Sequence, residues 1–255
     1  QLAIDTLNTA ITNDPTNIHI LHSLGEAQYN AKQFKHAYES FIKASNTVQS
    51  NHKKNKTLKA IYLTRAGDAL MSQQQKPQAI SMWQKALLED PENLELQKKL
   101  GKALMSQNRY EEASIAFENA IEHSNKSSTA ILGAAEAAMA SGEKHRAYRH
   151  LKNMGIDGLK DADDYYKAGL LHFQLNNYDA AIAALKISVD LEPDKALYRS
   201  MLARIFGLTN NILGATNEAE IALTNSTADI DVLTNTGIAL LHSQKHELAL
   251  KSFSQ

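Results

Sequence analysis

The chain contains no cysteine, so disulfides, thiolate zinc sites and cysteine nucleophiles are all excluded. Only four prolines interrupt its 255 residues. No apolar run approaches the roughly 18–20 residues that a membrane-spanning helix requires. Charges of both signs nearly balance, with a net charge of −1, so no overall field attracts the chain to nucleic acid or anionic lipid. An apolar content of 43% is nevertheless ordinary for a folded protein.

What the sequence does contain is a repeat with a period of 34 residues. Repeats follow one another without insertion and begin at Ala60, Leu94, Ser128, Ala162, Ala196 and Ile230. An earlier repeat begins at Ile18 and is eight residues longer, with the excess between Val48 and Lys59. Half a repeat, residues 1–17, precedes it, and the last repeat stops at Gln255. We therefore expect a single repeat array over residues 1–255 that is a fragment of a longer protein.

Small residues recur at fixed positions of the repeat. Position 20 is alanine in every repeat: Ala3, Ala37, Ala79, Ala113, Ala147, Ala181, Ala215 and Ala249. Position 8 is glycine or alanine: Gly25, Gly67, Gly101, Ala135, Gly169, Ala203 and Gly237. Position 24 carries Leu7, Phe41, Trp83, Phe117, Leu151, Leu185, Ala219 and Phe253. The small residues let two antiparallel helices approach closely, and the larger side chain at position 24 fills the space beside them. Each pair has an apolar face that it buries only against its neighbours.

The register predicts where the helices lie. First helices are expected near 18–31, 60–74, 94–107, 128–141, 162–175, 196–209 and 230–243. Second helices are expected near 2–13, 34–50, 77–90, 111–124, 145–154, 178–191, 212–224 and 246–255. Proline at position 32 ends three of the second helices, at Pro15, Pro91 and Pro193. The repeat that begins at Ala196 has Arg199 and Ala219 in core positions, so we expect looser packing there. The turn from Gly155 to Gly158 is expected to be flexible.

This pattern resembles the tetratricopeptide repeat family over essentially the whole chain. The resemblance implies an all-α fold, a right-handed α-solenoid whose first helices line a concave groove. The family's groove positions, carried over to this sequence, give a candidate partner-binding set: Tyr29, Met71, Lys98, Lys102, Met105, Leu132, Met139, Tyr166, Leu170 and Phe173. Flexible methionines at one position of consecutive repeats suit an adaptable apolar surface. The alternative is that these side chains pack between adjacent first helices and bind nothing.

The function that the resemblance implies is a non-catalytic scaffold that binds a peptide or a partner protein in its groove. By analogy of fold, the expected settings are bacterial secretion, pilus assembly or polysaccharide export. The alternative is a regulatory or substrate-recruiting region of an enzyme, such as a glycosyltransferase, whose catalytic domain lies outside these residues. The sequence leaves open whether the compartment is the bacterial cytoplasm or the periplasm. It also leaves the oligomeric state open, with end-to-end stacking of copies as one expectation.

Catalysis, cofactors and metals find no support in the motifs. The sequence has no glycine-rich nucleotide loop, no HExxH and no nucleophile elbow. His19 and His22 lie three residues apart, but no third metal ligand accompanies them. We therefore expect neither an enzyme nor a cofactor or metal site.

The charged residues bear on two further classes of ligand, a C-terminal carboxylate and nucleic acid. One subtype of the family clamps a C-terminal carboxylate, but its pattern fails here after Lys98, where Lys102, Gly133 and Asp163 replace the required side chains. The groove is mildly acidic overall, so we expect no nucleic acid partner. The lysine-rich stretch from His52 to Lys59 is expected to be a solvated helix extension or a protruding loop, with docking of an acidic surface as the alternative.

Overall fold

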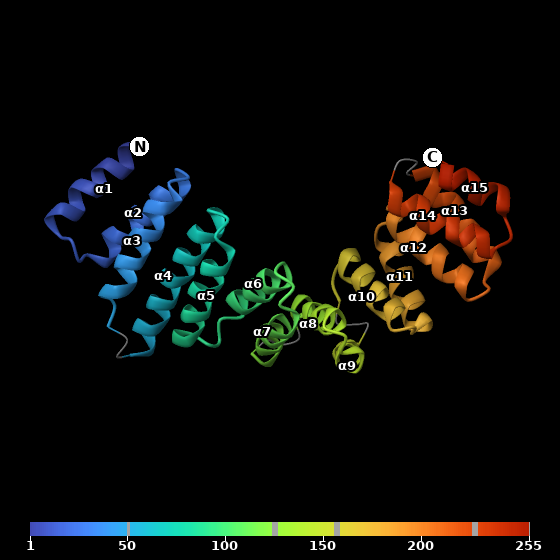
Figure 1. The fold of residues 1–255 in the computed structure, drawn as a ribbon, viewed down its shortest axis with the longest axis horizontal. Helices are drawn as coiled ribbons and strands as arrows, with labels where there is room; N and C mark the ends of the chain where they lie inside the picture. Colours follow the sequence, from blue (N-terminus) through green and yellow to red (C-terminus); the bar gives the residue numbers. More distant parts are fainter. Residues whose placement is uncertain (50–51, 124–126, 156–158, 226–228, 255) are drawn as a thin grey trace. The chain divides into compact units, whose positions relative to one another are not determined.

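The computed structural model describes residues 1–49, 52–123, 127–155, 159–225 and 229–254. Within these ranges it contains fifteen helices and no strand, which confirms the predicted all-α repeat fold (Figure 1). The chain divides into two compact units, Gln1–Asn125 and Lys126–Gln255, and each is described by itself below. In the described part of the chain, no helix combines the length and the apolar character needed to cross a bilayer.

The helix boundaries follow the predicted register. Unit 1 holds α1 Leu2–Asn13, α2 Ile18–Asn30, α3 Phe34–Thr47, α4 Lys53–Ser72, α5 Lys76–Glu89, α6 Leu94–Met105 and α7 Tyr110–Glu122. Unit 2 holds α8 Ser128–Ala140, α9 Lys144–Met154, α10 Ala162–Gln174, α11 Tyr178–Leu191, α12 Ala196–Leu208, α13 Ile212–Asn225, α14 Ile230–His242 and α15 His246–Ser254. The even-numbered helices are the first helices of their repeats, and the odd-numbered helices are the second. Only α4 departs from its expected bounds by more than three residues.

Helix α4 is long because it absorbs most of the lysine-rich excess. It begins at Lys53 and runs for 20 residues, so the stretch from that point is a helix extension and not a protruding loop. Lys59 Nζ lies 2.8 Å from Glu89 Oε1 of α5, which fastens the extension to the next helix. Residues 50 and 51 lie outside the described ranges.

Every first helix ends in the same turn, a feature that the sequence register did not predict. The residue at position 15 has a left-handed backbone, with φ between 58° and 86°, at Lys32, Gln74, Asn108, Gly142, Asn176, Asn210 and Gln244. The next amide then donates to the carbonyl five residues earlier, as from Asn177 N to His172 O at 2.9 Å. This is the Schellman arrangement, which satisfies the carbonyls at the end of a helix. It fixes the angle at which each second helix folds back.

In unit 1 the position-24 aromatics of α3, α5 and α7 pack onto the position-8 glycines of their first helices. A Cβ added at Gly101 would lie 2.8 Å from the Phe117 ring, and one added at Gly67 would lie 2.5 Å from the Trp83 ring. Phe117 is only 2% exposed as a result. Glycine is therefore needed here for close approach, as the small residue at position 8 predicted.

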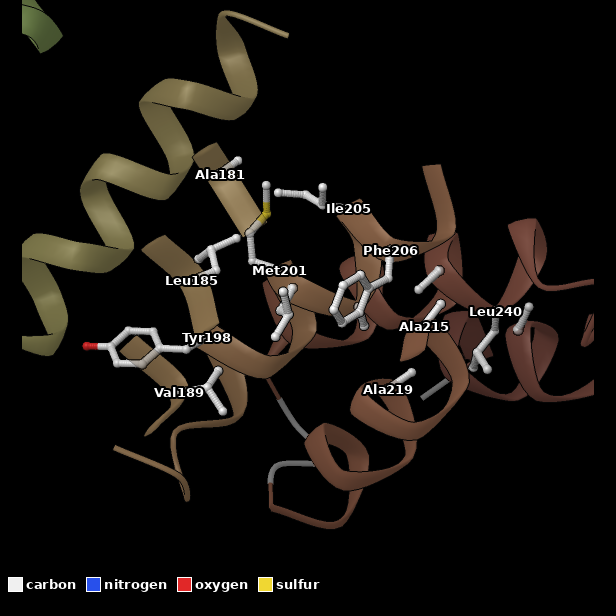
Figure 2. Packing of buried hydrophobic residues seen from close by; sticks show 14 of the residues in the cluster. Ala181, Leu185, Val189, Tyr198, Met201, Ile205, Phe206, Ala215, Ala219 and Leu240 are labelled. Atoms are coloured by element: carbon white, nitrogen blue, oxygen red, sulfur yellow. The ribbon is translucent and has the colours of Figure 1, made fainter. Parts of the chain in front are cut away.

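Unit 2 builds a large buried cluster around α12, in the repeat that was expected to be loose. Ala219 is fully buried and belongs to the same cluster as Tyr198, Ile205 and Phe206 of α12 (Figure 2). Arg199, the other irregular residue, donates from Nη1 to Glu218 Oε2 at 2.7 Å, and both side chains are largely buried. These contacts argue against the looseness that the two irregular residues suggested.

The turn from Gly155 to Gly158, which was predicted to be flexible, lies mostly outside the residues that the structure describes. Gly155 ends α9 with φ at +66°, and residues 156–158 lie outside the described ranges.

Candidate functional site

The predicted groove residues of unit 1 lie on one side of its first helices, which we call the first-helix face. Tyr29, Met71 and Met105 stand at position 12 of α2, α4 and α6, and each is partly exposed. Lys102 is exposed. Lys98 is more covered, and its Nζ lies 2.5 Å from Glu95 Oε1 one helical turn away.

Polar side chains link adjacent first helices across this face of unit 1. Arg65 of α4 donates from Nε to Glu26 Oε1 of α2 at 2.6 Å, and this hydrogen bond raises the pKa of the guanidinium. Lys99 of α6 lies 2.8 Å from Asp68 of α4. The hydroxyls of Tyr29 and Ser72 are 3.0 Å apart. Several polar groups at expected groove positions are therefore already paired within the chain.

Unit 2 brings three predicted groove residues together on α10. Tyr166, Leu170 and Phe173 are partly buried and pack against the cluster around α12. Tyr166 stacks on Tyr198 with ring centroids 4.8 Å apart and an interplanar angle of 30°. The Arg204 guanidinium carbon lies 5.3 Å from the centroid of the Phe173 ring.

Acidic groups surround the stacked tyrosines of unit 2. The Tyr198 hydroxyl donates to Asp163 Oδ1 of α10, and burial raises the pKa of Tyr198 above its ordinary value, with that hydrogen bond as the second cause. Burial also raises the pKa of Tyr166 to about 12, with smaller contributions from the carboxylates of Asp231 and Asp229. Both hydroxyls therefore stay protonated at neutral pH.

The remaining predicted residues of unit 2 differ in their exposure. Met139 on α8 is partly exposed. Leu132, also on α8, is only 4% exposed, so it contributes almost no surface. For Leu132 the structure therefore agrees with the alternative of packing within the array.

The histidine pair considered as a metal site takes part in other contacts. His22 Nε2 lies 3.5 Å from Glu26 Oε1, and its ring contacts Tyr62 at 5.5 Å between centroids. No group of three metal-binding side chains occurs among the residues that the structure describes.

A different surface of unit 1 carries hollows that the sequence analysis missed. A hollow of about 650 Å³ lies between the second helices α5 and α7, with Leu100 and Leu104 of α6 among its lining residues. A second hollow, of about 410 Å³, lies between α3 and α5. Lys85 and Leu88 of α5 line both hollows. We call the two hollows together the second-helix groove. The signal for it is in the sequence, because Leu88 is apolar where most other repeats are polar.

Unit 2 has a smaller hollow, which also lies between two successive second helices. It measures about 210 Å³ and lies between α9 and α11, with His172 of α10 in its lining. Burial lowers the pKa of His172, so its imidazole is neutral at pH 7.

Comparison with known families supports the assignment that the repeat pattern indicated. A family model described as tetratricopeptide repeat matches residues 64–129 and 166–219. The chain is a tetratricopeptide repeat protein. A second model, described as anaphase-promoting complex, cyclosome, subunit 3, matches residues 106–188. No curated protein matches the sequence.

Solved structures with the same fold share little sequence with this tetratricopeptide repeat protein. The C-terminal part of a TPR repeat-containing protein from Cytophaga hutchinsonii has a TM-score of 0.70 at 13% identity, over 91% of this chain and 92% of that one. PilW, described as a type IV pilus biogenesis factor, has a TM-score of 0.61 at 15% identity, over 77% and 91%. YrrB, described as a TPR protein with an unusual peptide-binding site, has a TM-score of 0.54 at 19% identity, over 68% and 89%. Proteins of this repeat class are typically interaction scaffolds, and this general role is the one that the family supports for the chain.

Proposed function

We propose that the chain is a non-catalytic scaffold that binds a peptide or a segment of a partner protein on its first-helix face. Position 12 carries the proposal. Its side chains remain partly exposed at Tyr29, Met71 and Met105 in unit 1 and at Met139 and Phe173 in unit 2, while the alanines at position 20 are fully buried from α3 onward. Apolar side chains that recur on one exposed face of a repeat scaffold typically mark an interaction site.

The chemistry of this face favours a partner with apolar side chains. Methionine adapts its shape to what it contacts, so Met71 and Met105 can accommodate partner side chains of different shapes. The polar groups beside them, such as Arg65 and Glu26, are paired with each other and offer few free charges. Binding would therefore depend mainly on apolar burial.

Two of the similar proteins are compatible with this role. YrrB is described by a peptide-binding site, and PilW by a part in pilus biogenesis. We extend to this chain only the class of function, a scaffold for protein partners, with pilus or secretion assembly as the setting to be tested.

The test is partner capture from a lysate of the source organism with the parent chain and two variants of the first-helix face. One variant carries Met71→Glu and Met105→Glu in unit 1, and the other carries Leu170→Glu and Phe173→Glu in unit 2. The matched control is Leu213→Glu, which places the same charge on a leucine that is 83% exposed on α13. Circular dichroism melts first establish that each variant is folded.

The proposal predicts a protein that the parent and the Leu213→Glu control capture and that at least one first-helix variant loses. Equal capture by all four folded chains would contradict it and would move the binding site away from the first helices.

A further inference from the structure

The second-helix groove of unit 1 has an apolar lining that its repeat pattern does not require. Leu88 occupies position 29, where five other repeats have the polar residues Thr12, Asn46, Glu122, Asp190 and Thr224 and the Ser128 repeat has Ile156. Ile115 occupies position 22, where the others have Asp5, Glu39, Ser81, Arg149, Ala183, Asn217 and Lys251. Most repeats therefore form without a large apolar residue at either position.

These two exceptions belong to the same hollow. Leu88 of α5 and Ile115 of α7 both line the larger hollow, and they are 82% and 51% exposed. Leaving two large apolar side chains largely in water gives up much of the stabilisation that their burial would provide. Their pairing in one hollow therefore indicates that something outside the chain covers them.

The charged residues that line the hollow indicate which charge the occupant carries. Glu112, on the α7 wall, accepts hydrogen bonds from Arg109 Nε and Nη2 at 2.8 and 2.7 Å. In the adjoining hollow, Glu89 is likewise paired with Lys59. Lys85, which lines both hollows, takes part in none of the ion pairs found in the described residues. The uncompensated charge between the two apolar hollows is therefore positive.

We propose that the second-helix groove docks an amphipathic helix of a partner protein, with an acidic side chain placed between apolar anchors to meet Lys85. A helix fits better than an extended strand, because the walls α5 and α7 use their own backbone groups internally and offer no edge for strand pairing. Leucine-like anchors spaced three or four residues apart would enter the hollows on either side of Leu88. This surface lies on the second helices, so it is separate from the first-helix face and goes beyond the function proposed above.

The probe is a synthetic acetylated peptide of about 16 residues, made of leucine, alanine and glutamate, with leucines at i, i+4, i+7 and i+11. A matched basic peptide has every glutamate replaced by lysine. A third peptide replaces one central alanine of the acidic peptide by proline, which breaks the helix. Binding to the complete chain is measured by isothermal titration calorimetry.

The acidic peptide is expected to bind about fivefold more tightly than the basic one, as one exposed charge pair supports. Leu88→Glu and Ile115→Glu should each weaken it by about tenfold or more. Lys85→Glu should reverse the preference between the two peptides. Leu213→Glu on α13 should bind like the parent.

Several results would overturn the proposal. They are equal binding of the acidic and basic peptides, unchanged binding by folded Leu88→Glu, or equal loss in the Leu213→Glu control. Undiminished binding of the proline peptide would show that an extended occupant takes the place of the helix. Because Met71 and Met105 are unchanged in these variants, a failure here leaves the first-helix proposal standing.

Discussion

The two units differ in the residue that fills the space beside position 8 of the first helix. In unit 1 an aromatic ring of the second helix lies there, as with Trp83 and Phe117, and a glycine on the first helix receives it. In unit 2 Phe253 packs onto Gly237 in the same way, but the three preceding second helices carry Leu151, Leu185 and Ala219 at that position. The repeat with Ala219 nevertheless contains a buried cluster that includes Tyr198 and Phe206 of its first helix. A small residue at position 24 therefore does not by itself mean that a repeat lacks a core.

This difference also changes the surfaces that remain for binding. Polar pairs such as Arg65 with Glu26 link first helices of unit 1, and the exposed apolar residues Leu88 and Ile115 lie on its second helices. Unit 2 joins α10 to α12 through stacked tyrosines, which cover part of the face that was expected to bind a partner. The lesson is that apolar side chains at groove positions serve packing and binding to different degrees in the two units.

The largest effect is expected from removing an aromatic that unit 1 needs. Phe117→Ala leaves a cavity above Gly101, and we expect it to lower the free energy of unfolding by about 3–5 kcal/mol. Urea unfolding followed by the fluorescence of Trp83, the only tryptophan, reports on unit 1 directly. Since Ala219 already occupies this position in unit 2, a loss below 1 kcal/mol for Phe117→Ala would mean that the two units do not differ in the way described.

A smaller loss is expected from crowding the same contact. Gly101→Ala places a methyl group against the Phe117 ring and should cost about 1–3 kcal/mol. Phe117→Leu in the same chain should recover most of the loss, because Ala135 and Leu151 already form that combination in unit 2. The double-mutant cycle is measured by the same urea titration, and simple additivity of the two changes would contradict the account.

A gain of about 1 kcal/mol is expected from Gln74→Gly. Gln74 has a left-handed backbone with φ at 62°, which costs energy for any residue with a Cβ, whereas Gly142 adopts the same conformation in unit 2 without that cost. The midpoint of urea unfolding by Trp83 fluorescence should rise. An unchanged or lower midpoint would show that contacts of the Gln74 side chain stabilise the fold by at least as much as the left-handed backbone costs.

The smallest effect concerns pH and is confined to unit 2. Burial lowers the pKa of His172, so below about pH 6.5 the unfolded chain takes up a proton before the folded chain does. Stability from this group is present above pH 6.5 and is lost as the pH falls toward the folded pKa. The midpoint of urea unfolding, measured by circular dichroism, should fall less between pH 7.5 and pH 5.5 in His172→Leu than in the parent. An identical loss in parent and variant would contradict the prediction.

Much of the fold follows from the period alone, because it fixes which residues face a neighbouring helix. Small residues at positions 8 and 20 and polar breaks between them give the helix boundaries to within three residues, α4 apart. The left-handed turn at position 15 is harder to predict, since Lys32, Gln74 and Gln244 give no sign of it. The Schellman hydrogen bonds impose that conformation on whatever residue is there.

The candidate site is less predictable, because exposure depends on neighbours that the register does not specify. Tyr166 and Phe173 occupy groove positions, yet their exposure is set by Tyr198 and Arg204 on the next first helix. Leu88 is the opposite case. Its position is polar in most other repeats, so comparing repeats position by position marks it as unusual, together with Ile156 of the Ser128 repeat.

The most direct test of the comparison between units is native-state hydrogen exchange of α12 against α6. The account predicts that the amides of α12 are protected to within about tenfold of those of α6, because α12 and Ala219 belong to one large buried cluster that includes Tyr198 and Phe206. If α12 and α13 exchange first and far faster than α6, the Ala196 repeat is loosely packed after all, and the account of unit 2 is wrong.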